Sequence, residues 1–157
     1  MYEMRGNRVA PMQEVEISHI ALNVSSILGF NKRNRKHCDR LFEQLSEYGI
    51  IIDPMSDKEW AKYTNDLTRG HFYPPTRTIR IPERIYTMAC RGERDALFVM
   101  LHELGHLFLG HNAVLHNAKE RPTRIEDAEW QADTFAERIL IETVSFTQLT
   151  RPAKRGG

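Results

Sequence analysis

Two histidines and a glutamate stand in one short segment whose spacing suits metal chemistry. His102 and His106 are four residues apart in the run His102-Glu103-Leu104-Gly105-His106, and helical spacing places them one turn apart on one face. Two imidazoles so placed can direct nitrogens at one ion, with bonds of about 2.0–2.1 Å for zinc. Glu103 projects roughly 100° around the helix, which is where a general base for an activated water belongs.

A catalytic zinc site needs three protein ligands and an open position, so a third ligand must come from elsewhere. A metzincin-type site has a glycine three residues and a histidine six residues after the second histidine, but these positions hold Leu109 and Asn112. His111 is one residue short of that scheme and follows Gly110. We therefore expect His111 at or beyond the helix end, where an imidazole favours the helix C-terminus over the metal.

A glutamate from a later helix is the other source of a third ligand. Glu129 and Asp133 are four residues apart and share a helix face with the small residues Ala132 and Ala136, which favour close approach of two helices. We expect Glu129 to reach the metal. Asp133 can then accept the free N–H of a ligating histidine and fix its tautomer.

The sequence alone also permits other interpretations of these residues. The run from His102 to His106 could be a polar stripe on an ordinary helix, and Glu129 with Asp133 could be a solvated acidic face. Among competing carboxylates, Glu126 is explained by a capping box, and Asp127 lies roughly 160° around the helix from Glu129.

The elements that must position these residues follow from apolar periodicity and stop signals. Glycines at 29, 49 and 110 end helical patterns, and Ser/Thr–Glu capping boxes begin others at 56 and 123. The sequence predicts helices over 12–28, 38–48, 56–63, 94–109 and 123–140, strands over 50–52 and 78–81, and a turn over 70–75. Helices, a little sheet and then two helices predict an α+β fold with the sheet packed on the long helix.

Composition excludes several classes of protein. The 157 residues carry a net charge of +1, so no global electrostatic argument favours nucleic acid or a membrane as a partner. Cys38 and Cys90 read as free thiols of a reducing cytosol, and the N-terminus lacks the apolar core of a signal peptide. We expect a cytoplasmic protein with a flexible segment over 1–11, one domain over 12–150 and a disordered tail over 151–157.

Three motifs together resemble the ImmA/IrrE family of bacterial and phage metallopeptidases. They are His102-Glu-Leu-Gly-His106, Leu107-Phe-Leu-Gly-His111 and Glu129-Trp-Gln-Ala-Asp133. The resemblance is strongest over 70–141, and the strand segment 76–83 also fits a short sheet before the active-site helix. It implies a compact zincin-like domain that binds Zn²⁺ through His102, His106 and Glu129, with Glu103 as the catalytic glutamate.

The resemblance also implies a function. Members of that family typically cut a helix-turn-helix transcriptional repressor and so relieve repression in a stress response or mobile-element transfer. The expected activity is therefore a zinc-dependent endopeptidase acting on a specific protein. The alternative is a non-cleaving, zinc-containing regulator that binds and sequesters its partner. Tyr73, Tyr86 and His116 are candidates for stabilising the oxyanion.

Overall fold

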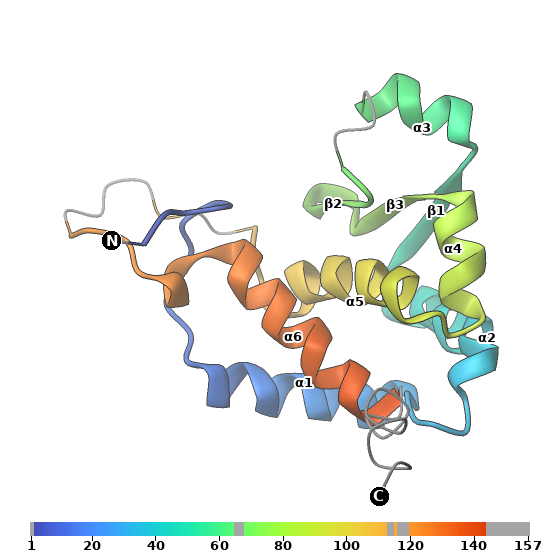
Figure 1. The fold of residues 1–157 in the computed structure, drawn as a ribbon, viewed down its shortest axis with the longest axis horizontal. Coiled ribbons are helices and arrows are strands. Elements are labelled where there is room, and N and C mark those ends of the chain that lie inside the picture. The colour runs from blue at the N-terminus through green and yellow to red at the C-terminus, as the bar shows by residue number, and fades with distance from the viewer. Residues whose placement is uncertain (1, 65–67, 113–114, 116–119, 144–157) are drawn as a thin grey trace, which may run out of the picture.

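The computed structural model describes residues 2–64, 68–112, 115 and 120–143. Helices and strands alternate irregularly along the chain, with short 3₁₀ turns between some of them (Figure 1). The elements are α1 (Glu14–Leu28), α2 (Cys38–Glu43), β1 (Ile51–Met55), α3 (Asp57–Thr64), β2 (His71–Tyr73), β3 (Thr78–Pro82), α4 (Glu83–Cys90), α5 (Arg94–Phe108) and α6 (Ala128–Thr143).

In space, the small sheet, α5, α6 and α1 lie one after another in a stack. The sheet has the order β1-β3-β2, with β3 parallel to β1 and antiparallel to β2. Helix α5 contacts β2 and β3 on one side and α6 on the other, and α6 in turn packs against α1 (Figure 1). The predicted α+β, zincin-like arrangement, with the sheet against the helix that carries His102, is therefore confirmed.

The core surrounds α5, and one part of it lies between this helix and the sheet. Ile79 and Ile81 of β3 are fully buried, as are Leu97, Leu101 and Leu104 of α5. Each such side chain contributes roughly 1.5–3 kcal/mol when it is removed from water. This apolar contact fixes the rotation of α5 about its axis, and the rotation decides where the polar side chains of the helix point.

Helices α5 and α6 approach closely at one glycine. A Cβ at Gly105 would lie 3.1 Å from Cδ1 of Phe135 and 3.2 Å from both Cα and the carbonyl oxygen of Ala132. A side chain there would require these neighbours to move by a few tenths of an ångström, so glycine suits the close approach of the two backbones. The predicted close approach of the small residues is therefore present, and it brings the acidic face of α6 within reach of the α5 histidines.

Three segments differ from the sequence prediction. The expected turn over 70–75 contains β2 and the start of a 3₁₀ turn, and the helix α4 was not predicted. The capping box of Thr123 and Glu126 forms, but it begins a 3₁₀ turn. The extended backbone of Asp127 then interrupts the helical conformation, so α6 begins only at Ala128.

Other expectations concern the ends of the chain and its environment. The domain boundaries stay a prediction, and the predicted tail over 151–157 lies outside the described residues. Cys38 and Cys90 are both free thiols. No helix in the described ranges is long and apolar enough to cross a membrane.

Candidate metal centre

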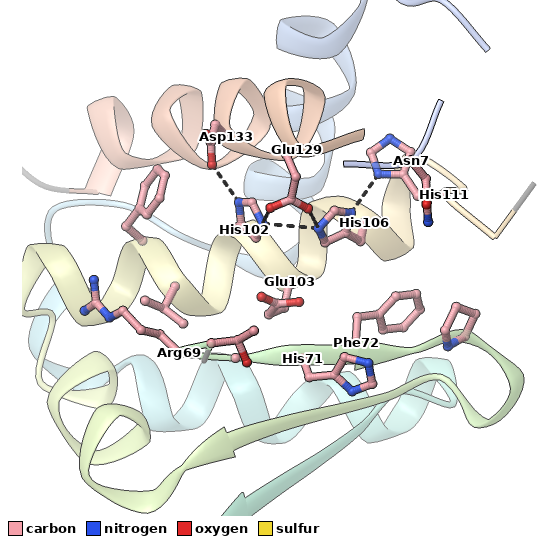
Figure 2. A pocket seen from close by; sticks show the side chains of 15 residues that line it. Asn7, Arg69, His71, Phe72, His102, Glu103, His106, His111, Glu129 and Asp133 are labelled. Atoms are coloured by element: carbon pink, nitrogen blue, oxygen red, sulfur yellow. Dashed lines mark hydrogen bonds and ion pairs between the residues drawn. The ribbon is translucent and has the colours of Figure 1, made fainter. Parts of the chain in front are cut away.

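Three side chains from two helices converge on one position between α5 and α6 (Figure 2). His102 and His106 lie one turn apart on α5, and Glu129 stands in the first turn of α6. Nε2 of His106 lies 3.1 Å from Nε2 of His102 and 2.9 Å from Oε2 of Glu129. Nε2 of His102 lies 3.3 Å from Oε1 of Glu129. The structure thus brings the three predicted ligands together.

The separations of these donor atoms fit a single zinc ion. Two nitrogens bonded to zinc at tetrahedral angles lie about 3.3 Å apart, given bonds of about 2.0–2.1 Å. The two nitrogens are 3.1 Å apart, and each lies 2.9–3.3 Å from a different carboxylate oxygen of Glu129. Two imidazole nitrogens and one carboxylate are also the donor set of a two-His, one-Glu catalytic zinc site. The residues present are therefore compatible with zinc.

Asp133 holds the ring of His102. Its Oδ1 accepts the Nδ1–H of His102 at 2.7 Å, which leaves Nε2 of the ring to face Glu129. Burial acts to lower the pKa of His102, but the hydrogen bonds to Asp133 and Glu129 outweigh it and raise the pKa to about 10. The predicted orienting contact between α6 and a histidine of α5 is thus present for His102.

A second chain of hydrogen bonds holds the ring of His106. The side-chain amide of Gln131 donates to the carbonyls of Ala10 at 2.9 Å and Ile125 at 2.6 Å, so its Oε1 must accept. Oε1 lies 2.7 Å from Nε2 of His111, which therefore carries the proton of that ring. Nδ1 of His111 then accepts from Nδ1 of His106 at 2.9 Å. The chain leaves Nε2 of His106 free for a metal.

His111 has a different role from the one expected at the helix end. It follows α5, as predicted, but its side chain is buried and contacts His106 instead of the terminal carbonyls. Burial lowers its pKa to about 4, so the ring is neutral and can act as an acceptor. The sequence carries no signal for this contact, because the acceptor that fixes the ring of His111, Gln131, lies 20 residues away.

Glu103 lies on the sheet side of the same site. Figure 2 shows its carboxylate between the α5 histidines and β2. A Cβ at Gly70 would lie 3.2 Å from Oε2 of Glu103, and the backbone N–H of Phe72 donates to the carboxylate. Burial raises the pKa of Glu103, although the neighbouring histidines act to lower it. A buried carboxylate with a raised pKa is suited to accept and return a proton.

A cleft of about 700 Å³ borders these residues. It runs between β2 with the preceding loop on one side and α5 with the start of α6 on the other (Figure 2). A smaller hollow of about 300 Å³ adjoins it at His106, and Phe72 and Pro74 line both spaces. The site is therefore open to an elongated molecule.

Several other sequence candidates lie away from the cleft. The ring of Tyr73 packs under the guanidinium of Arg80 at 5.5 Å, and Tyr86 packs against Phe42. Neither tyrosine lines the cleft, and His116 lies outside the described residues. Glu126 pairs with Arg8 and Asp127 is fully buried beside the N-terminal residues. None of the described alternatives therefore competes with Glu129 as a ligand.

Comparison with known proteins agrees with this geometry. A peptidase family model described as the IrrE N-terminal-like domain matches residues 60–156. That range covers more than half of the chain and includes both helices of the site. No curated protein and no solved structure matches the chain. The chain belongs to the ImmA/IrrE family of metallopeptidases, as the resemblance of its three motifs predicts.

Proposed function

We propose that this protein is a cytoplasmic zinc-dependent endopeptidase. His102, His106 and Glu129 would hold the metal, Glu103 would act as general base, and Asp133 would orient His102. The observation that carries the proposal is the closed triangle of donor atoms with a buried glutamate beside it. A purely structural zinc site has four protein ligands and needs no base.

The chemistry assigned to this chain is proton transfer at Glu103. A zinc ion, when bound, would acidify a water molecule and polarise the peptide carbonyl. Glu103 would accept the proton of that water and deliver it to the leaving amine. The backbone N–H of Phe72 holds the carboxylate in place, and Gly70 leaves room for it.

The shape of the cleft supports cleavage within a chain. Space continues on both sides of His106, toward Phe98 in one direction and toward Leu107 and Phe108 in the other. Among the described strands, β2 is an edge strand with β3 as its neighbour. An extended peptide can add to such an edge through backbone hydrogen bonds. In an exopeptidase, one end of the cleft would be expected to be blocked.

We propose a helix-turn-helix transcriptional repressor as the substrate. This step rests on the family to which the chain belongs, and it is therefore an analogy. Its physical requirement is an exposed, extended segment in the repressor, because only such a segment fits beside β2. Cleavage there would relieve repression without direct contact between the peptidase and DNA.

The substitution Glu103→Gln tests the proposal. Incubation of the zinc-loaded protein with a proteome-derived peptide library, followed by mass spectrometry of new termini, should reveal internal cleavage. Glu103→Gln keeps the size of the side chain and should retain zinc while it lowers the cleavage rate at least about 100-fold, the scale of general base catalysis. Equal cleavage by both proteins would contradict the assignment of Glu103.

The variant Glu103→Gln also distinguishes cleavage of a partner from the alternative function, in which the protein binds and sequesters the partner without cleaving it. With a helix-turn-helix repressor encoded beside this gene as the probe, the peptidase should relieve repression in a reporter assay, and Glu103→Gln should not. If the variant relieves repression as well as the wild type, binding and sequestration explain the function instead. Absence of zinc in the purified wild-type protein, with stability unchanged by chelators, would contradict both readings.

A further inference from the structure

The residues at the N-terminus, 2–9, form a strap across the start of α6. The strap is attached to the buried carboxylate of Asp127. Its Oδ2 accepts from the Tyr2 hydroxyl at 2.6 Å and from the Arg5 amide at 2.8 Å, and its Oδ1 accepts from the Gly6 amide at 3.1 Å. Oδ1 also accepts from the amide of Glu129 at 2.9 Å. One carboxylate thus joins the strap to the helix turn that carries a proposed metal ligand.

Further backbone contacts continue the attachment. The carbonyl of Asn7 accepts from the amide of Ala128 at 3.0 Å, and the amide of Val9 donates to the carbonyl of Glu126 at 2.8 Å. The side chain of Arg8 pairs with that of Glu126 at 3.1 Å. Figure 1 shows the N-terminal chain beside the beginning of α6. The strap is therefore held at successive residues and not at one point.

Two contacts of the strap reach the metal centre itself. Nη2 of Arg5 lies 2.9 Å from Oδ2 of Asp133, the oxygen that His102 does not use. Gly6 lies flat against the ligand Glu129, since a Cβ at position 6 would be 2.6 Å from its Cγ. Gly6 does not have a positive φ. An alanine there would force the side chain of Glu129 or the strap to shift, and the strain would come from this contact and not from the backbone conformation of residue 6.

We infer that the strap positions residues of the proposed metal centre. Gly6 confines the side chain of Glu129, and Arg5 fixes Asp133, so zinc affinity depends on residues 2–9. The inference rests on the proposed zinc site. It adds residues from outside the range 60–156 that the family model matches. Arg5 and Gly6 are positioning residues, because they act through Asp133 and Glu129.

The physical reason is preorganisation. Glu129 lies at the start of α6 with 35% of its side chain exposed, and a free glutamate has several rotamers of similar energy. The backbone of the strap blocks those that turn toward Gly6. A carboxylate already placed for the ion loses less conformational freedom when the metal binds, and outer contacts of this kind tune affinity.

The test compares zinc affinity with stability in full-length point variants. Gly6→Ala should weaken zinc binding at least about 10-fold, the usual effect of disturbing the surroundings of a ligand, and Arg5→Gln should weaken it less. Arg5→Lys should restore part of the loss. Arg33→Gln, at an exposed arginine in the segment between α1 and α2, is the matched control. Affinity is measured by competition with a chromogenic zinc chelator, and folding by the Tm of the metal-free proteins.

Cobalt substitution supplies a second measurement. The visible bands of bound Co²⁺ report the geometry of its ligands, so Gly6→Ala should shift them while Arg33→Gln leaves them unchanged. If the strap serves only the fold, Gly6→Ala and Arg5→Gln will lower the Tm yet bind zinc as tightly as the wild type, and the inference is overturned. If the wild type itself binds no zinc, the proposed function fails first, which is a distinct outcome.

Discussion

The two histidines of the candidate metal centre are held by partners of different chemistry. His102 donates to the carboxylate of Asp133, which carries a negative charge and pairs on its outer side with Arg5. His106 donates to a neutral imidazole, His111, whose orientation is set by an amide. We call His102, Asp133 and Arg5 the ionic arm of the site, which reaches partly exposed groups. His106, His111 and Gln131 form the neutral arm, whose outer residues are buried.

The difference predicts unequal contributions to metal binding. A carboxylate partner raises the basicity of a ligating imidazole more than a neutral acceptor does, because it stabilises the positive charge that develops on the ring. A neutral acceptor fixes the tautomer with little change of charge. The ionic arm should thus supply affinity, and the neutral arm should supply orientation.

The largest expected effect on zinc affinity comes from Asp133. Asp133→Ala removes both the acceptor and the charge, and zinc affinity should fall about 100-fold, the upper end of the usual range for such partners. Asp133→Asn keeps an acceptor oxygen without the charge and should lose about 10-fold. Chelator competition on both variants measures the two contributions. Equal losses would mean that the charge accounts for the whole effect and a neutral acceptor for none of it, whereas wild-type affinity in Asp133→Asn would mean that the charge contributes nothing to the ionic arm.

The neutral arm should respond more weakly. His111→Ala deprives the Nδ1–H of His106 of its acceptor, so the ring can rotate and zinc affinity should fall about 10-fold. His19→Ala, which removes an exposed histidine of α1, is the control for the loss of an imidazole. A loss larger than that of Asp133→Ala, measured in the same chelator assay, would reverse the order of the two arms.

The ionic arm could be predicted from sequence, and the neutral arm could not. The spacing of His102 and His106, and of Glu129 and Asp133, places each pair on one helical face, and small residues indicate that the two faces meet. These are regular periodicities within helices. His111 lies beyond the end of α5, and no periodicity relates a residue in a loop to an amide on another helix.

Other features of the fold also leave no periodic pattern in the sequence. The strand β2 has three residues beside two prolines, so its composition indicates a turn, although it lies next to Glu103. The contacts of residues 2–9 use mainly backbone groups around the carboxylate of Asp127, and backbone groups leave no signature in the sequence. Asp127 was set aside as a ligand by its angle around a predicted helix, but that helix begins only at Ala128, so the role of Asp127 at its start was not foreseen.

The smallest expected effect on zinc affinity, and the sharpest comparison, comes from Gln131. Gln131→Glu puts a carboxylate at the end of the neutral arm, so that it resembles the ionic one. At pH 8 the new carboxylate still accepts from His111, and zinc affinity should be unchanged or slightly higher. Stability should nevertheless fall by about 2–4 kcal/mol, because the buried carbonyls of Ala10 and Ile125 lose their donors.

Gln131→Met loses the same donors and also the acceptor, so it should match Gln131→Glu in urea denaturation but His111→Ala in chelator competition. If both variants bind zinc as the wild type does, the amide serves only the fold, and the neutral arm ends at His111.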